Sequence, residues 1–253
     1  MNKIKAFFFD QDGVIIDTER DGHRVSFNKT FKEFGFNFEW NEEEYHELLQ
    51  IGGGKERITH YLNTKGFRIP VKKEDQEELI KSLHKRKTEI FMKMLEADEL
   101  PLRPGILRIM REINQLDLKL GICTTSAVKT ATLISEKLLT GVAFDFIIAG
   151  DMVKKKKPDP EIYLLAMEKL GLKPDECVVI EDSEIGTKAA KQAGCYVLCT
   201  INDYTKDEDL SNADIIINNL GDENAEKALI LKGRFVGFNG SISAEMIVNT
   251  FNT

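Results

Sequence analysis

Short apolar runs alternate with longer amphipathic segments along most of this chain. The first run, Phe7-Phe8-Phe9, ends abruptly in Asp10-Gln11-Asp12-Gly13. Beyond residue 100 the pattern switches repeatedly between the period of a strand and that of a helix. It predicts strands over 119–123, 144–149, 177–180, 196–200 and 213–217, and helices over 106–115, 129–139, 160–170 and 186–193. Such strict alternation is typical of an α/β fold, in which a doubly wound, mainly parallel Rossmann-like sheet carries helices on both faces.

Residues 20–97 have a different character. Apolar side chains such as Phe27, Phe31 and Leu83 recur there at helical spacing among many charges, and no segment alternates like a strand. We therefore expect an α/β core made of residues 1–16 and 100–253. A helical cap of residues 17–99 is inserted straight after the first acidic motif, in a position to act as a lid over it. Glycines at 52–54 and a loop at Pro70 interrupt the cap helices.

The end of the chain is less strongly patterned. A helix is expected over 224–231, and the tail that follows receives no role.

Composition narrows the class of protein further. The 253 residues are 42% hydrophobic and carry a formal net charge of −7, which fits a globular protein with a small-molecule partner and argues against a nucleic-acid binder. No stretch approaches the roughly 20 apolar residues of a membrane span. The four cysteines are irregularly spaced and fit buried thiols in a reducing compartment better than a zinc site. We expect a cytoplasmic monomer that acts on neither membranes nor nucleic acids.

The two carboxylates after the first strand are the strongest chemical signal. Side chains repeat every second residue along a strand, so Asp10 and Asp12 can point the same way, and Gly13 lets the chain turn. Like charges this close need a cation or a shared proton, which indicates a metal site or an acid/base couple. A plain strand-end turn is an alternative. A calcium loop is not, because Asp21 occupies the twelfth position, where that loop requires Glu.

Other polar groups follow the later strands and should meet these acids at one edge of the sheet. Thr124-Thr125-Ser126 offer hydroxyls and backbone amides that can cradle a phosphate, or Thr125 or Ser126 can simply cap the next helix. Lys157 ends a run of four lysines, and Pro158 after it restricts its backbone and gives its ammonium a fixed direction near the acids. The other three lysines are typical of a solvated loop.

A second pair of acids, Glu181 and Asp182, follows another apolar run and precedes Ser183 and Gly186. Taken singly, acids at a helix N-terminus have an ordinary explanation. Together with Asp10 and the Asp12 region they form an oxygen-only site, which suits Mg²⁺ better than zinc or copper.

These residues resemble the four motifs of the haloacid dehalogenase superfamily of phosphotransferases, over nearly the whole chain. The motifs are Asp10-Gln11-Asp12-Gly13-Val14, Thr124-Thr125-Ser126, Lys157-Pro158 and Glu181-Asp182-Ser183 with Gly186. A cap inserted after the first motif resembles the β-phosphoglucomutase-like subfamily. Within it, residues 17–24, 51–57 and 83–88 are similar to the CbbY-type xylulose-1,5-bisphosphate phosphatases.

The resemblance implies a role for each motif. Asp10 would be the nucleophile that forms an aspartyl-phosphate, and Asp12 the general acid/base that protonates the leaving sugar oxygen. Mg²⁺ would be held by Asp10, the backbone carbonyl of Asp12 and Asp182, with Glu181 close by. Thr124 and Lys157 would hold the transferring phosphoryl group, with Thr125 and Ser126 beside it.

By the same resemblance the cap binds the sugar. The candidate substrate-binding residues in it are Glu19, His23, Arg24, Gly53, Gly54, Lys55, Arg57, His84 and Lys87. Glycine lets backbone amides approach an anion, and the basic side chains suit a second phosphate, although each can also be ordinary solvated surface.

Three functions remain open at this point. A Mg²⁺-dependent phosphatase of small phosphorylated sugars is favoured, a phosphosugar mutase of the β-phosphoglucomutase type is the alternative, and a non-catalytic phosphate-binding or regulatory module is the third. β-Phosphoglucomutases carry a cap-hinge histidine where this chain has Gly22, with His23 one place later, and that departure favours the phosphatase.

Overall fold

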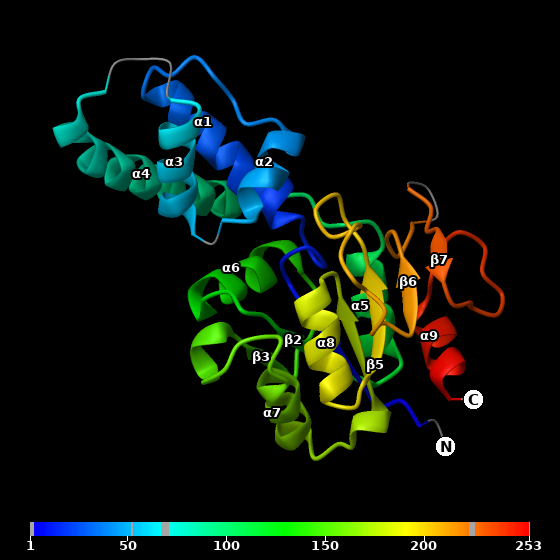
Figure 1. Cartoon of the computed structure of the whole chain (residues 1–253). Coiled ribbons are helices and arrows are strands. Elements are labelled where there is room, and N and C mark those ends of the chain that lie inside the picture. Colours follow the sequence, from blue (N-terminus) through cyan, green and yellow to red (C-terminus); the bar gives the residue numbers. More distant parts are fainter. Residues whose placement is uncertain (1–2, 52, 67–70, 223–225, 253) are drawn as a thin grey trace. The chain divides into compact units, whose positions relative to one another are not determined.

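The chain divides into two compact units, a core unit of Met1–Asp17 and Pro101–Thr253 and a helical unit of Thr18–Leu100. A computed structural model of the chain describes residues 3–51, 53–66, 71–222 and 226–252. Figure 1 shows both units, coloured along the sequence. Gly52 and Pro70, which were expected to interrupt the cap helices, lie outside the described residues.

The core unit is built on a mainly parallel sheet, which confirms the predicted α/β fold class. Within the described residues the strand order is β3-β2-β1-β4-β5-β6-β7, and only the β6–β7 pair is antiparallel. The strands are β1 (Ala6–Phe9), β2 (Lys119–Cys123), β3 (Phe146–Ile148), β4 (Cys177–Glu181), β5 (Tyr196–Thr200), β6 (Ile215–Ile217) and β7 (Ile230–Lys232).

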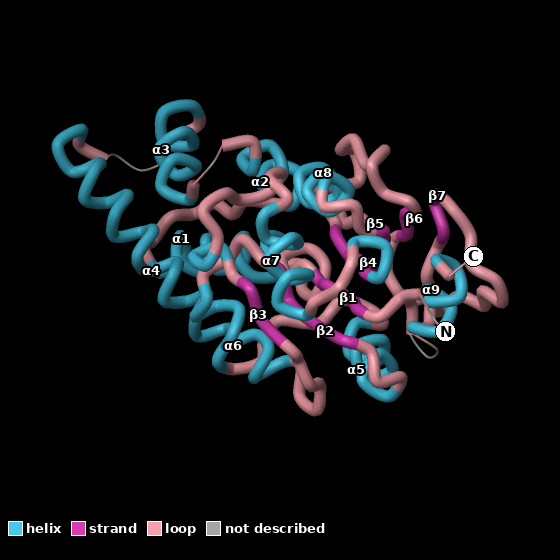
Figure 2. The backbone as a smooth tube through the Cα atoms, turned by 90° about the horizontal axis from the view of Figure 1, so that it is seen from below, coloured by secondary structure: helices cyan, strands magenta, loops and turns pink. Residues whose placement is uncertain are grey.

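Helices cover both faces of this sheet. Figure 2 shows α5 and α6 on one side of the strands and α7 and α8 on the other. Buried residues of α7 and α8 pack on Phe8, Val179 and Val197, which alternate with residues facing the opposite layer. The helices of the unit are α5 (Ile106–Gln115), α6 (Val128–Leu138), η3 (Gly150–Met152), α7 (Glu161–Leu170), η4 (Pro174–Glu176), α8 (Glu184–Gln192) and α9 (Ala244–Phe251).

The register of the three central strands determines where the polar groups gather. Phe9 of β1 pairs with Ile122 of β2 on one side and with Ile180 of β4 on the other. The backbone N–H of Asp10 continues this ladder by donating to the Ile180 carbonyl at 2.9 Å. Residues that follow the three strands therefore emerge at one edge of the sheet.

The helical unit contains no strand among its described residues, as its sequence pattern predicts. Its elements are the π-helical η1 (Thr18–Arg24), α1 (Val25–Glu33), α2 (Glu42–Leu49), α3 (Gly54–Thr64), η2 (Lys73–Asp75) and α4 (Gln76–Glu96). An aromatic cluster fills its centre, in which the buried ring of Trp40 lies 4.8 Å from those of Phe27 and Phe31. The unit thus has a core of its own.

The predicted helix over 224–231 is wrong where the structure describes it. Residues 223–225 lie outside the described residues, and Ile230–Lys232 form β7 instead, paired with β6 at the edge of the sheet. Exposure in this segment alternates, from 2% at Ala228 to 60% at Leu229 and 55% at Leu231. The closely spaced apolar residues of this segment fit a helical pattern in the sequence. Pairing with β6 makes the segment a strand instead, in which exposure alternates from residue to residue.

The sequence pattern also missed α9, which packs against α5. Ser243 caps this helix by accepting a hydrogen bond from the Met246 N–H at 3.1 Å, and Ile247, Val248 and Phe251 are buried. The signal is only eight residues long, which explains why it did not stand out from the loop before it.

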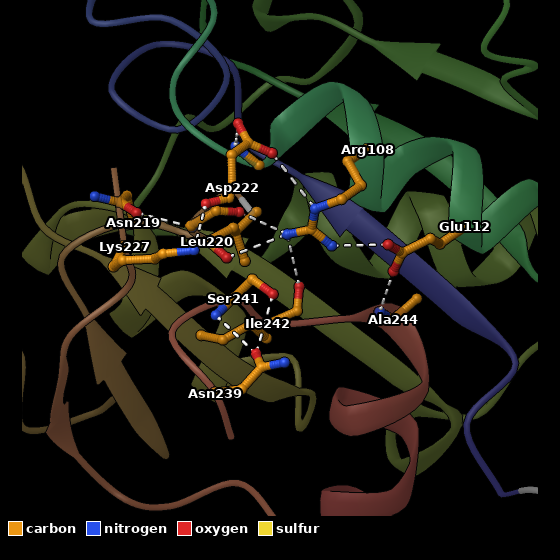
Figure 3. Close-up of polar contacts among 12 residues, drawn as sticks. Arg108, Glu112, Asn219, Leu220, Asp222, Lys227, Asn239, Ser241, Ile242 and Ala244 are labelled. Atoms are coloured by element: carbon orange, nitrogen blue, oxygen red, sulfur yellow. Dashed lines mark hydrogen bonds and ion pairs between the residues drawn. The ribbon is translucent and has the colours of Figure 1, made fainter. Parts of the chain in front are cut away.

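Arg108 of α5 holds this C-terminal segment to the sheet. Figure 3 shows its guanidinium surrounded by acceptors from the last part of the chain. It donates to the carbonyls of Gly221 at 2.7 Å, Ile242 at 3.1 Å and Leu220 at 3.2 Å, and pairs with Glu112 at 2.7 Å. The other carboxylate oxygen of Glu112 accepts from the Ala244 N–H, in the first turn of α9. One arginine therefore satisfies carbonyls from two separate loops.

Two further observations bear on the sequence predictions. All four cysteines are free and buried, as expected. None of the helices in the described residues is both long and apolar enough to cross a membrane.

We expect Arg108→Met to lower the free energy of unfolding by about 2 kcal/mol, because it removes the guanidinium donor from the carbonyls of Gly221 and Ile242. The Leu220 carbonyl and the Glu112 carboxylate also lose one donor each and keep a backbone N–H. Arg111→Met is the matched control, since Arg111 lies on the same helix and makes one exposed bond, to the Thr140 carbonyl. It should stay within about 0.5 kcal/mol of the parent. Urea denaturation measures both, and equal losses would show that the Arg108 contacts add nothing.

Candidate active site

Three carboxylates gather at the edge of the sheet where β1 and β4 end. Asp10, Glu181 and Asp182 each place an oxygen within 4.8 Å of the others, and the residues are only 7%, 0% and 6% exposed. The ladder explains the meeting, because Asp10 and Glu181 directly follow the paired residues Phe9 and Ile180. The structure thus brings together three of the four acids that the sequence predicts for a metal site.

Lys157 supplies the positive charge inside this cluster. Its ammonium donates to Asp10 Oδ1 at 2.6 Å, Glu181 Oε1 at 2.6 Å and the Cys123 carbonyl at 2.9 Å. All three of its hydrogens are therefore used. Contact with a phosphate oxygen, which the sequence analysis expected, would have to replace one of these bonds. The rest of the lysine run, Lys154–Lys156, is exposed.

The charges in the cluster do not balance. Three carboxylates and one ammonium leave a net charge of −2, and burial makes the excess costly. Burial, with Glu181 and Asp12 nearby, raises the pKa of Asp10 to about 8 against the lowering effect of Lys157. Burial and then Glu181 and Asp10 raise the pKa of Asp182 well above its usual value. Although burial alone would lower the pKa of Lys157, Asp10 and Glu181 raise it, so this residue stays a cation.

A divalent cation fits this donor set on the grounds of charge and chemistry. Two positive charges would offset the excess of −2, and carboxylate oxygens are the ligands that Mg²⁺ prefers. Gly13, with φ of +86°, adds a second argument, because a Cβ there would lie 2.0 Å from Asp182 Oδ2. The absence of a side chain lets the backbone next to Asp12 come against Asp182.

Glu181 is held from all sides. Its Oε1 accepts from the buried Tyr163 hydroxyl as well as from Lys157, and its Oε2 accepts from the Asp182 N–H at 3.2 Å. A Cβ at Gly186 would lie 2.0 Å from Oε2, so only glycine allows the first turn of α8 to approach so closely. Burial, followed by Glu181 and Asp10, raises the pKa of Tyr163, which keeps it a hydrogen-bond donor.

Asp12 has different surroundings from Asp10. Its Oδ2 accepts from the Ser126 hydroxyl at 2.6 Å and from the Thr124 hydroxyl at 3.3 Å. Ser126 does not cap α6, since Ala127 occupies the cap position and no side chain bonds there. Thr125 is half-buried, and its carbonyl lies against Gly150. The hydroxyl motif is therefore tied to the second aspartate instead of the helix.

In the helical unit, Lys87 is a buried cation with unusual partners. It is 7% exposed, and its ammonium lies 2.9 Å from His23 Nδ1 and about 5 Å from the ring centres of Phe27 (4.9 Å) and Phe91 (5.4 Å). Among the described residues no carboxylate forms an ion pair with it. Burial lowers its pKa to about 8, with Glu19 and Arg57 acting in opposite directions.

Other predicted cap residues are bonded to one another. The Arg57 guanidinium lies 3.7 Å from Glu19 Oε2 and 3.3 Å from the Tyr45 hydroxyl, which itself donates to Glu19. Arg24 pairs with Glu42 at 3.2 Å and donates to the Trp40 carbonyl. These two arginines thus help to hold the unit together.

The glycines of the cap motif allow close packing. A Cβ at Gly54 would lie 2.8 Å from the His84 ring, and Gly53 has φ of +98° with Glu56 against it. Burial, followed by Lys87 and Lys55, lowers the pKa of His84. Lys55 itself is exposed.

Sequence reasoning missed two residues at the sheet edge. Tyr163 looks like any core aromatic of a helix, and only its contact with Glu181 distinguishes it. Asn202 follows β5 and donates to Asp182 Oδ2 at 2.8 Å. A polar residue directly after a predicted strand, at the edge where the acids gather, was the signal that could have found it.

The comparison with family models identifies the class. Residues 4–194 match the model of haloacid dehalogenase-like hydrolases, so the chain belongs to this hydrolase family. The resemblance to this family, expected from the sequence, is thereby confirmed.

Its relatives include CbbY proteins. The chain is 47% identical over 226 residues to a CBBY-like protein of Arabidopsis thaliana, covering 88% of this chain and 71% of that one. It is 37% identical over 223 residues to protein CbbY of Cereibacter sphaeroides, covering 87% and 94%. A crystal structure of a CbbY mutant from Rhodobacter sphaeroides in complex with xylulose-(1,5)bisphosphate matches with a TM-score of 0.65 at 36% identity, over 85% of this chain and 94% of that one.

We expect Lys87→Met to raise the free energy of unfolding at pH 7 by on the order of 2 kcal/mol, because it removes a buried charge and keeps an unbranched chain of similar length. The pKa of Lys87 is about 8 in the folded protein and 10.5 ordinarily. Below pH 8 both states are protonated and the full cost of burial is present. Between pH 8 and 10.5 only the unfolded chain stays protonated, so the native protein gains stability as pH rises.

The advantage of Lys87→Met should therefore shrink above pH 8 and vanish near 10.5. Urea denaturation at pH 7 and pH 9.5 measures it, with Lys85→Met, at an exposed position of the same helix, as the control. If Lys87→Met were less stable than the parent at pH 7, the burial of the Lys87 charge would not cost folding free energy as we expect.

Proposed function

We propose that the protein is a Mg²⁺-dependent phosphatase of small phosphorylated sugars, with a sugar bisphosphate such as xylulose-1,5-bisphosphate as the preferred substrate. Membership of the hydrolase family and similarity to CbbY proteins support this proposal. So does the ligand of the related crystal structure of a CbbY mutant, xylulose-(1,5)bisphosphate.

The observation that carries the proposal is the contrast between Asp10 and Asp12. Asp10 lies in an ionic cluster with Lys157, whereas Asp12 faces the hydroxyls of Ser126 and Thr124. Two carboxylates in different environments can take different roles in one reaction. Asp10 is then the nucleophile, and Asp12 is the general acid/base.

The reaction has two steps. A carboxylate oxygen of Asp10 attacks phosphorus, the bond from phosphorus to the sugar oxygen breaks, and Asp12 gives its proton to that oxygen. Asp12 then takes a proton from a water that attacks the aspartyl-phosphate, which releases inorganic phosphate and restores Asp10. Ser126 and Thr124 hold the Asp12 carboxylate in place through both proton transfers.

Asp10, the Asp12 backbone carbonyl and Asp182 would hold Mg²⁺, with Glu181 beside them. When bound, the ion neutralises charge on the phosphoryl oxygens. Lys157 contributes a second positive charge to the same group and, through its bond to Oδ1, orients the nucleophile.

The helical unit would bind the distal phosphate. Lys87 is the strongest candidate, because it is a buried cation without a carboxylate partner among the described residues, and a phosphate would supply that partner. His23 bonds to it, and the exposed Lys55, which like Lys87 acts on the charge of His84, adds a second positive charge. Glu19 and Arg57, which form a pair, are assigned to shaping the site.

Hydrolysis is favoured over mutase action by the space around Gly22. A Cβ at this position would lie 2.7 Å from the Phe91 ring. The hinge histidine of a β-phosphoglucomutase therefore has no room there. Four free, buried cysteines support the expected cytoplasmic location, where thiols stay reduced.

We expect Asp10→Asn to lower kcat for phosphate release by at least about 10³-fold, since an amide is a poor nucleophile. Phosphorus NMR of sugar mono- and bisphosphates with Mg²⁺ follows the products. It also separates free phosphate from a positional isomer, which would indicate a mutase. Asp207→Asn, at an exposed acid, is the control. An unchanged rate in Asp10→Asn would exclude the proposed nucleophile.

We expect Lys87→Met to raise KM for a bisphosphate by about 10- to 100-fold, with little effect on a monophosphate, because one charge-assisted contact is lost. In the parent, KM for the bisphosphate should rise above pH 8 as Lys87 loses its proton, and this rise should be absent in the variant. Lys55→Ala should act in the same direction, and Lys85→Met should have no effect. Equal changes for both substrates would rule out a role in binding the second phosphate.

A further inference from the structure

Asn202 lies in the loop after β5, where hydrogen bonds within the loop fix the orientation of its side-chain amide. Its Oδ1 accepts hydrogen bonds from the backbone N–H groups of Tyr204 at 2.9 Å and Thr205 at 3.1 Å. The backbone N–H of Asn202 donates to the Thr205 hydroxyl at 3.2 Å. The oxygen of the side chain is therefore committed to the loop, and Nδ2 must face away from these donors.

That nitrogen donates to Asp182. The distance from Nδ2 to Oδ2 is 2.8 Å, and the carboxylate is buried. A hydrogen bond to one oxygen fixes the rotation of a carboxylate about its Cβ–Cγ bond and so the direction in which the other oxygen faces.

Arg103 sets the distance between the two sides of this contact. Its guanidinium donates to the Gly13 carbonyl and, at 2.5 Å, to the carbonyl of Ile201, the residue before Asn202. Further bonds reach the Thr200 hydroxyl at 3.0 Å and the Asn218 carbonyl at 2.7 Å. One side chain thus ties the turn after β1 to the loop after β5. Asp182 Oδ2 lies between them, against Gly13 on one side and Asn202 on the other.

We infer that Asn202 is a positioning residue for the divalent cation: its amide holds Asp182 in the orientation that binds the ion, on a loop that Arg103 anchors. The inference rests on the proposed Mg²⁺-dependent function. Asn202 acts through Asp182 and needs no contact of its own with substrate.

The test is Asn202→Ser, read out by direct binding of Mn²⁺ in electron paramagnetic resonance titrations. A serine hydroxyl can still accept from the loop N–H groups, but it is too short to reach Asp182. We expect the Kd for Mn²⁺ to rise about tenfold or more, as outer-shell changes typically do. The Mg²⁺ concentration needed for half-maximal activity should rise in parallel, with kcat largely restored at saturating Mg²⁺.

Thr205→Val is the matched control. It removes the hydroxyl that accepts from the Asn202 N–H and leaves the amide bond to Asp182 untouched, so metal affinity should stay within about twofold. An unchanged Kd in Asn202→Ser, or an equal loss in Thr205→Val, would overturn the inference. If the parent itself binds no Mn²⁺, the proposed function fails as well.

The parent protein offers a second measurement that does not depend on the variants folding. The side-chain amide resonance of Asn202 should shift when Mg²⁺ is added, because its partner Asp182 becomes a ligand. The side-chain amide of Asn114, whose bonded partner is the Ala143 carbonyl, serves as the reference. An Asn202 signal that does not respond while Mg²⁺ binds would count against the role.

Discussion

Three ionised carboxylates cannot be buried within 4.8 Å of one another unless positive charge or a shared proton offsets them, and much of the core unit follows from this constraint. Lys157 supplies part of it from the loop after β3, with all three ammonium hydrogens bonded. The remaining charge of −2 defines what else can enter. Under the proposed function, a divalent cation and a phosphoryl group would satisfy the site together, because the ion would offset the acids and also neutralise the phosphate. Binding would then make use of the excess negative charge.

The rest of the edge serves to keep these charges in place. Parallel register places Asp10 and Glu181 side by side, and Tyr163 and Lys157 both donate to Glu181 Oε1. Two positions gain from having no side chain, since Gly13 and Gly186 let backbone approach Asp182 and Glu181 to distances that a Cβ would block. A site assembled in this way does not need substrate to organise it. Its groups are fixed in advance, which lowers the cost of reorganisation during the reaction.

The features of this architecture that depend on short, local sequence patterns were predictable. The strands around Asp10, Thr124 and Glu181 were expected within a few residues, because apolar runs ending in polar groups mark buried parallel strands. The order of β6 and β7 and the existence of α9 were not predictable, since β7 is decided by pairing at the sheet edge and α9 by packing on α5. Ser126, which donates to Asp12, lies 114 residues further along the chain, and Asn202, which donates to Asp182, lies 20 residues further along. No local sequence pattern specifies which hydroxyl or amide will make these contacts.

The buried cations of the two units, Lys157 and Lys87, differ in how well the protein compensates their charge. Lys157 has two carboxylates and a carbonyl, so its charge is compensated within the fold. Lys87 has an imidazole nitrogen and two aromatic rings as neighbours, and these stabilise a cation far less than carboxylates do. Burial therefore lowers the pKa of Lys87. A buried charge that costs folding free energy can be kept where function requires it. Lys157 is thus compensated without substrate, whereas under the proposed function an anion would compensate Lys87. Discrimination among phosphorylated sugars would then rest on the helical unit, whose buried cation the fold alone does not compensate.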